Sequence, residues 1–365
     1  MKKTIISFLT MIAIVSVSLT GCGMNRISYC KNKPRLNVFN WGEYIDKDVI
    51  SEFEEKNQVC VNYSTFLDNE TALTKMKTES YDIVFPSEYS IEQLKTDDLI
   101  EKIDWTKLTA NKDEVFADSL MTLLNKVKNE FEYNFLDYAV PYFWGCVGIV
   151  YNPAKVSLAD LESQNWDIFK NKNYDMVFYD SSKDAYMVAL KQLGLSTNTS
   201  NKDEIAQATS WLKNTIDGNR SNITFLTDEI LDSMPSLDYD LAICYSGDAN
   251  YIMEKNSNLR FYKPNVGTNV WVDGMVIPKN AENKDLAYQF IDFLLTDEVA
   301  YKNTTYVGYT TPVKSVYDRV TAADGDFSHL TDSYKIEVLE KDEMYKYLGS
   351  DIKALIESEW MKIKI

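Results

Sequence analysis

Strand and helix patterns alternate through the first third of the chain, and this alternation restricts the fold more than any other feature. The apolar run 36–39 predicts a strand, and apolar residues at helical spacing predict a helix over residues 46–56. The same reading predicts strands over 59–63 and 81–85, separated and followed by helices over 70–78 and 91–99. A strand–helix–strand–helix–strand order implies an α/β fold with a parallel, doubly wound sheet.

The middle of the chain predicts a passage into a second lobe. Residues 139–145 combine proline, glycine and aromatics just before a predicted strand over 147–151. A later apolar segment, 271–278, is expected to return to the first lobe. We therefore expect a first lobe of residues 36–139 plus 274–318 and a second lobe of residues 140–273 plus 319–365.

The N-terminus carries a targeting signal. Lys2 and Lys3 precede an apolar run over 5–17, and the segment ends in Leu-Thr-Gly-Cys at Cys22. This ending resembles a bacterial lipobox and predicts a lipoprotein signal peptide (1–22), lipidation of Cys22 and a flexible tether (23–35). The alternatives are an ordinary signal peptide or a short span, although the run is short and serine-rich for a span. The expected location is the extracytoplasmic face of the cell membrane.

Composition limits the possible partners. The formal net charge is −17, and it becomes −19 once Lys2 and Lys3 are removed with the signal peptide. A nucleic-acid partner is not expected, because phosphate binding needs a basic surface. An acidic body attracts cationic ligands, although acidity could equally serve solubility alone.

The reactive residues give little sign of catalysis. Cys30, Cys60, Cys146 and Cys244 show no metal-ligand spacing, and whether any two form a disulfide is left open. The single histidine, His329, is too little for a histidine-based metal site, and no metal or cofactor is expected. The usual nucleophile, zinc and phosphate-binding motifs are absent, so we do not expect an enzyme. A hydrolase that uses two carboxylates remains the alternative.

Aromatic, acidic and hydroxyl residues gather where predicted strands end. Since these strand ends converge in an open α/β sheet, the residues are expected to share one cleft. Any single aromatic among them could instead be a core residue, and Tyr44 could simply begin the next helix. The groups are Trp41 with Glu43, Ser87 with Tyr89, Asp180 with Asp184, Tyr245 with Asp248, and Trp271 with Asp273.

Several longer segments follow one another in a characteristic order: Asn-Trp-Gly-Glu-Tyr at 40–44, then 63–65 with 69–71, 81–89, 140–145, 271–274, 277–281 and 308–312. In these segments, and from residue 36 to its end, the chain resembles the spermidine/putrescine-binding proteins of bacterial polyamine ABC importers. The resemblance implies a two-lobed type II periplasmic-binding-protein fold, each lobe a mostly parallel sheet flanked by helices, with the ligand cleft between the lobes. It also implies a monomer that delivers a polyamine to the permease subunits of an importer.

The resemblance also implies roles for individual residues. Glu43 and Asp273 would meet ammonium groups, and Asp184 would hold an amine in the second lobe. Ser181 stands where spermidine-preferring members often have an aspartate, whereas Asp248 resembles an acid of some putrescine-preferring relatives, so the choice of polyamine stays open. Another cationic solute, or iron or thiamine, is the family-level alternative. Ser87 would be a hydrogen-bond partner, and the methylene chain would be walled by Trp41, Tyr89, Tyr245, Trp271 and Tyr309.

Overall fold

The structure, a computed structural model, describes residues 29–130 and 133–365. The predicted signal peptide, the lipidation site Cys22 and residues 23–28 of the predicted tether lie outside the described residues. Within the described ranges, no helix has both the length and the apolar character that a membrane span requires.

The first sheet is parallel, as the alternating sequence pattern predicts. Its strands are β1 (Arg35–Trp41), β2 (Cys60–Phe66) and β3 (Ile83–Val84), in the order β2-β1-β3. The helices α2 (Lys47–Asn57), α3 (Asn69–Met76) and α4 (Glu88–Thr96) follow these strands in turn. The carboxylates of Asp46 and Asp68 cap the first two helices by accepting backbone N–H groups, which fixes where each helix begins.

The second sheet is mixed, with strand order β6-β5-β7-β4-β8 and β9 paired to β4. Its central strand, β4 (Val140–Tyr151), is buried along its whole length and runs antiparallel to its neighbours. The first part of β4 pairs with β9 and the last part with β7 and β8, so one strand connects two regions of the molecule. The other strands are β5 (Met176–Tyr179), β6 (Ile223–Leu226), β7 (Leu241–Tyr245), β8 (Arg260–Tyr262) and β9 (Val270–Met275).

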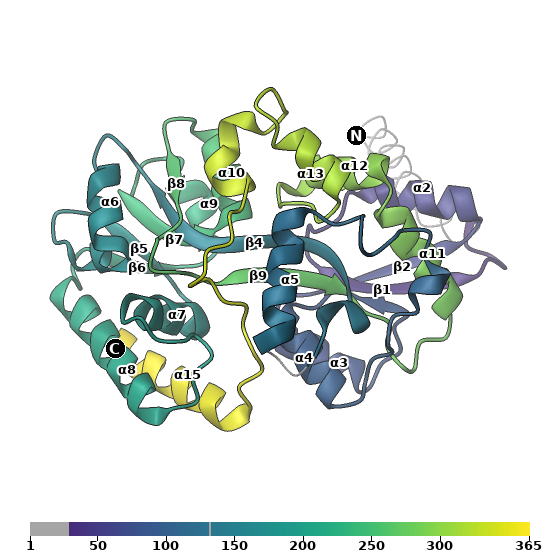
Figure 1. The fold of residues 1–365 in the computed structure, drawn as a ribbon, viewed down its shortest axis with the longest axis horizontal. Helices are drawn as coiled ribbons and strands as arrows, with labels where there is room; N and C mark the ends of the chain where they lie inside the picture. The colour runs from purple at the N-terminus through teal and green to yellow at the C-terminus, as the bar shows by residue number, and fades with distance from the viewer. Residues whose placement is uncertain (1–28, 131–132) are drawn as a thin grey trace, which may run out of the picture.

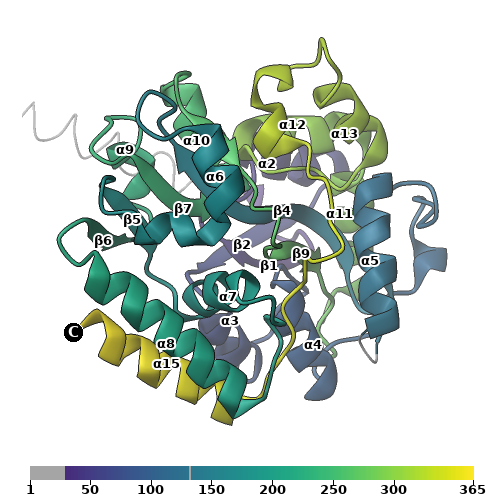
Figure 2. The same ribbon diagram turned by 60° about the vertical axis from the view of Figure 1, so that its left-hand side comes forward.

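Helices cover both sheets and define two lobes (Figures 1 and 2). We call the β2-β1-β3 sheet with its helices the first lobe, and the sheet containing β5 to β8 with its helices the second lobe. The first lobe also holds η1 (Trp105–Lys107), α5 (Asp118–Glu130), η2 (Phe135–Asp137), α11 (Lys284–Leu294), α12 (Asp297–Val307) and α13 (Lys314–Val320). The second holds α6 (Leu158–Gln164), η3 (Asn165–Lys170), α7 (Ser182–Gln192), α8 (Lys202–Gly218), α9 (Ile230–Ser233), α10 (Ser246–Lys255), η4 (Ser328–Leu330), α14 (Thr331–Tyr334) and α15 (Ser350–Lys364).

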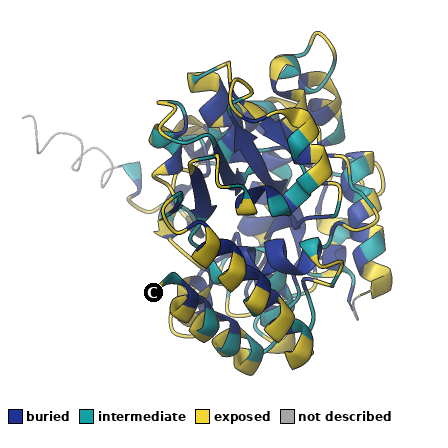
Figure 3. Ribbon diagram, turned by 90° about the vertical axis from the view of Figure 1, so that its left-hand side faces the viewer, coloured by how far each residue is buried: buried dark blue, intermediate teal, exposed yellow. Residues whose placement is uncertain are grey.

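Two hydrophobic clusters form the interior, and the strands lie at the centre of both (Figure 3). The larger cluster surrounds the first sheet, continues along β4 and β9, and reaches β7 and α10 in the second lobe. The other lies between the second sheet and the helices α7, α8 and α15, with Trp166, Phe178 and Trp360 among its buried rings. The larger cluster therefore packs across the junction of the two lobes.

A third segment, residues 335–349, also passes between the lobes (Figure 1). Towards the first lobe, the Tyr345 N–H donates to Glu88 on α4 over 3.3 Å. Towards the second lobe, the Thr197 N–H donates to Glu343 over 2.7 Å, and the Tyr345 hydroxyl donates to Asp184 over 2.8 Å. The segment is therefore fixed to both lobes beside β4 and β9.

A disulfide joins Cys30 to Cys60, with a Cα–Cα distance of 5.4 Å. This settles the question that the sequence left open. Both residues are buried, although Cys30 belongs to the predicted tether. Cys146 and Cys244 are buried free thiols.

Removing this disulfide is expected to destabilise the protein by about 3–4 kcal/mol, because it closes a loop of 30 residues in the unfolded chain. The measurement is urea unfolding of the Cys30→Ser/Cys60→Ser double variant. A reductant should lower the wild-type midpoint by a similar amount and leave the variant unchanged. Equal midpoints for oxidised and reduced wild type would contradict the prediction.

Candidate functional site

A buried carboxylate on β9, Asp273, lies where the two lobes meet. Its Oδ2 accepts a hydrogen bond from the Tyr44 hydroxyl at 2.8 Å. Its Oδ1 is also buried and has no hydrogen-bond partner in the described part of the chain. Burial raises the pKa of Asp273 to about 6, although the nearby hydroxyls of Ser87 and Tyr44 lower it. A carboxylate in this state has an oxygen available to a hydrogen-bond donor.

A second carboxylate, Asp248, lies in the first turn of α10 in the second lobe. It accepts a hydrogen bond at 2.9 Å from Tyr309, which follows α12 in the first lobe, so this contact joins the lobes. Burial raises the pKa of Asp248 to about 6, against the opposing effect of the bond from Tyr309. The Tyr44 and Tyr309 rings meet edge to face, 5.6 Å apart, so the hydroxyls bound to Asp273 and Asp248 come from adjoining rings.

A third carboxylate, Asp184, lies in the first turn of α7. It accepts one hydroxyl at each oxygen, from Tyr245 at 2.9 Å and from Tyr345 at 2.8 Å. Its helix begins at this point because Ser181 caps it by accepting the Asp184 N–H at 3.3 Å. Asp184 thus has fewer free hydrogen-bonding positions than Asp273.

Aromatic rings connect the three carboxylates. Trp271 packs edge-on against Tyr309 at 5.3 Å and against Tyr245 at 6.2 Å. Its indole N–H is buried and unpartnered among the described residues, as is that of the half-buried Trp41. We call the following set the interlobe cluster: Tyr44, Asp184, Tyr245, Asp248, Trp271, Asp273 and Tyr309.

Ser87 and Tyr89 lie beside this cluster at the start of α4. The Asn69 amide holds both residues, donating to the Tyr89 hydroxyl at 2.8 Å and to Ser87 Oγ at 3.1 Å. The Ser87 N–H donates back to Asn69 Oδ1 at 3.0 Å, and the Ser87 backbone pairs with that of Asp273. This arrangement connects β3, α3 and β9. The remaining predicted residue of the region, Trp41, packs on Phe66 with 4.6 Å between ring centres.

Glu43 lies apart from the interlobe cluster, although the sequence predicts that it shares the cleft with those residues. Its side chain is 76% exposed; it accepts a hydrogen bond from Tyr306 at 3.2 Å and lies 3.8 Å from Lys47. The physical reason is a turn: Glu43 adopts a φ of 48°, which directs the chain outwards after β1. Tyr44, whose place the sequence leaves open between the cleft and the start of a helix, reaches Asp273.

Two further residues of this region were not predicted from the sequence as site residues. Lys183 places its ammonium over the Tyr89 ring, 3.3 Å from the ring centre, and Tyr345 binds Asp184. Lys183 had a signal, because it precedes Asp184 at a helix start, where its side chain could reach the same region. Tyr345 lies in a segment without regular secondary structure, so no strand end or helix start marks it, and the resemblance identified it only as a departure near a glutamine of the family.

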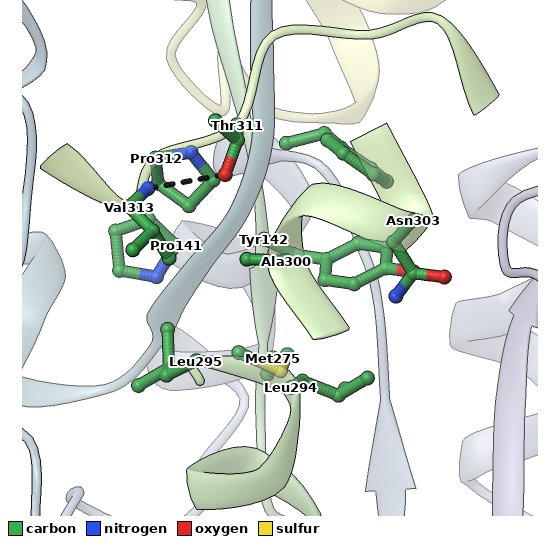
Figure 4. A pocket seen from close by; sticks show the side chains of 11 residues that line it. Pro141, Tyr142, Met275, Leu294, Leu295, Ala300, Asn303, Thr311, Pro312 and Val313 are labelled. Atoms are coloured by element: carbon green, nitrogen blue, oxygen red, sulfur yellow. Dashed lines mark hydrogen bonds between the residues drawn. The ribbon is translucent and has the colours of Figure 1, made fainter. Parts of the chain in front are cut away.

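Figure 4 shows a small cavity, whose lining includes Pro141, Tyr142 and Met275 and no residue of the interlobe cluster. Its volume of about 10 Å³ is at the lower limit for a single water molecule. Tyr142, one of its lining residues, donates to the Tyr44 carbonyl at 2.7 Å and so supports the cluster from behind. The cavity is too small for an organic ligand.

Gly247 permits the close approach of Tyr309 to α10, because an added Cβ would lie 1.4 Å from a ring carbon of Tyr309. We expect Gly247→Ala to displace that ring and to destabilise the protein by roughly 1–3 kcal/mol, as overpacking does. Urea unfolding measures the change. Gly218→Ala is the control: no atom lies within 4 Å of its Cβ, and alanine favours the helix, so stability should rise slightly. Equal effects in the two variants would contradict the prediction.

Comparison with known proteins gives consistent matches across the chain. The family model of bacterial extracellular solute-binding proteins matches residues 48–328. The spermidine/putrescine-binding periplasmic protein of Escherichia coli strain K12 is 31% identical over 283 residues, covering 76% of this chain and 77% of the relative. That of Salmonella typhimurium is 29% identical over 344 residues, covering 92% and 93%.

Solved structures agree with these matches. The spermidine/putrescine ABC transporter substrate-binding protein of Streptococcus pneumoniae is 30% identical, with a TM-score of 0.75 and coverage of 91% of this chain and 98% of that one. The TpPotD lipoprotein of Treponema pallidum is 26% identical, with a TM-score of 0.75 and coverage of 90% and 99%.

These matches confirm the α/β solute-binding-protein fold and the expectation that the chain is not an enzyme. They also indicate an extracytoplasmic location, since the family acts outside the cytoplasm. The chain belongs to the spermidine/putrescine-binding family of bacterial extracellular solute-binding proteins.

Proposed function

We propose that this protein captures a linear polyamine, putrescine or spermidine, and delivers it to an ABC importer. One observation carries the proposal: two carboxylates, Asp248 and Asp273, bind hydroxyls of adjoining tyrosine rings, and Asp273 keeps a buried oxygen unpartnered. A buried ammonium group must be paired, because its desolvation costs several kcal/mol. Carboxylates set into an aromatic wall supply that pairing.

The aromatic rings around these carboxylates suit the methylene chain of a polyamine. Each methylene group that leaves water contributes about 0.8 kcal/mol. A ring face within about 6 Å of an ammonium adds roughly 0.5–2 kcal/mol of cation–π attraction. Tyr245, Trp271 and Tyr309 provide contiguous rings for both contributions. The names of the relatives in Escherichia coli and Salmonella support the same ligand class.

Capture by closing lobes is the proposed mechanism. The moving units are residues 36–139 plus 274–318 and residues 140–273 plus 319–365. Three connections support this division, namely β4, β9 and the segment 335–349. The hydrogen bond from Tyr309 to Asp248 joins the units, so ligand binding beside it would favour the closed arrangement.

We further propose that the protein works as a monomer anchored to the membrane by a lipid on Cys22. The apolar run that ends in Leu-Thr-Gly-Cys supports the anchor. The Treponema pallidum relative, described as a lipoprotein, supports it independently.

Calorimetric titration of the purified protein with putrescine, cadaverine, spermidine and spermine tests the proposed ligand. At least one of these polyamines should bind saturably with one site per chain. GABA, which carries one ammonium and one carboxylate, is the matched control and should bind far more weakly. Absence of binding by all four polyamines would overturn the proposed function.

A further inference from the structure

We propose that the ammonium of Lys183 occupies one end of the polyamine site and thereby selects short diamines over longer polyamines. This inference rests on the proposed function and names the ligand length that the site would accept. It assigns to a residue of the chain itself the place that an additional ligand ammonium would take.

The position of Lys183 carries the inference. Its Nζ lies 3.3 Å from the centre of the Tyr89 ring and 4.8 Å from that of Tyr345. Tyr89 belongs to α4 in the first lobe, Tyr345 to the segment between the lobes, and Lys183 to α7 in the second lobe. The lysine therefore reaches across the lobe junction into a pair of aromatic faces, which is how such a site would hold an alkylammonium group.

The surroundings keep this ammonium charged. Burial lowers the pKa of Lys183, but Tyr89, Asp184 and Glu88 outweigh that effect, so the pKa lies above its ordinary value. Glu88 is itself buried beneath the site, where its carboxylate accepts the Val272 and Tyr345 N–H groups, each at 3.3 Å. Lys183 thus supplies positive charge close to Asp184 and Glu88.

The position of Lys183 affects which carboxylates remain available to the ammonium groups of a ligand. Both Asp184 oxygens already accept tyrosine hydroxyls, and its negative charge is partly balanced by Lys183. Asp248 and Asp273 each accept a single tyrosine hydroxyl, and of these two carboxyls only Asp273 is affected by the charge of Lys183, which lowers its pKa. Two carboxylates match the two ammonium groups of a diamine, whereas the third ammonium of a triamine would meet the charge of Lys183.

The test compares Lys183→Met with Lys202→Met, using calorimetric titration of both variants and the wild type with putrescine and spermidine. Methionine keeps the length of the side chain and removes its charge. Lys202 is exposed in the first turn of α8 in the same lobe, so its variant matches the change in net charge. The diagnostic quantity is the ratio of the two affinities. A long-range field acts more strongly on the triply charged spermidine than on putrescine, and Lys202→Met measures how much of any change in the ratio comes from that field.

We expect Lys183→Met to raise the spermidine-to-putrescine affinity ratio roughly tenfold, since about 1.4 kcal/mol of cation–π attraction becomes available to the third ammonium. Lys202→Met should leave the ratio within about twofold, as expected of a screened surface charge. An unchanged ratio in Lys183→Met, with both polyamines still binding, would overturn this inference alone.

Three other results are equally clear. Weaker binding of both polyamines to Lys183→Met would show that the lysine holds the lobes together or contacts the ligand directly, and the inference would fail. No binding of either polyamine by the wild type or by Lys183→Met would overturn the proposed function and this inference together. Binding of spermidine by Lys183→Met but not by the wild type would support both.

Discussion

Asp273→Asn is expected to weaken polyamine binding by about 2–5 kcal/mol, because a buried ammonium loses its charged partner. The loss corresponds to roughly thirtyfold to several-thousandfold in affinity. Asparagine keeps the shape of the side chain, so the Tyr44 hydroxyl retains an oxygen to donate to. Calorimetric titration with the best-binding polyamine measures the change.

Two other acids are the controls for this experiment. Asp113→Asn removes the charge of an exposed aspartate and should change the affinity by less than about 0.5 kcal/mol. Glu43→Gln should also have little effect, because the Glu43 carboxylate is exposed and bound to Tyr306. Similar losses from all three variants would indicate that the overall negative charge binds the ligand, and the site described here would be wrong.

Polyamine affinity is expected to fall by about a hundredfold between pH 7.5 and pH 5. Asp248 and Asp273 both have pKa values raised to about 6, chiefly by burial. The ligand amines stay protonated throughout this range, with pKa values near 10 like that of lysine. At pH 5 each carboxyl is therefore mostly protonated before binding, and each protonation costs about tenfold in affinity. Titrations at intervals of half a pH unit measure the profile.

In the ligand-free protein, the contribution of Asp248 and Asp273 to folding stability should change with pH in the opposite sense: it should increase as the pH falls. Their pKa values are raised above the unfolded values, so the folded state binds more protons between about pH 4 and pH 6. Their contribution to stability is present in full below about pH 4 and is lost as the pH rises through about 6. Thermal unfolding of wild type and of Asp248→Asn/Asp273→Asn isolates this contribution.

For the binding experiment, a polyamine affinity that is constant from pH 7.5 to pH 5 would contradict the raised pKa values of Asp248 and Asp273.

The sequence predicts the first sheet well because its signals are local. Apolar runs followed by capping residues such as Asp46 and Asp68 specify strands and helices without any distant contact. Asp248, Trp271 and Asp273 were singled out for a similar reason, since each belongs to or follows a strand whose end is visible in the sequence. Position relative to a strand is thus the part of the site that sequence can predict.

The rest of the site depends on contacts that no local pattern contains. Whether Glu43 or Tyr44 points inwards is decided by one backbone angle, and both residue types are compatible with either place. A lysine in the first turn of a helix normally points into solvent, so the position of Lys183 next to Asp184 does not by itself indicate that it reaches Tyr89 across the lobe junction. Tyr345 arrives from a segment more than 150 residues after Asp184 and is recognisable only once the chain is folded.

The disulfide between Cys30 and Cys60 also limits how far the protein could move from a membrane. In the lipid-anchored form that we propose, the chain between the lipid and the folded body would run only from Cys22 to Cys30, where the bond attaches it to β2. Eight residues span at most about 29 Å when fully extended. The protein would therefore search for its importer within a thin layer above the membrane, and its local concentration there would depend on this bond.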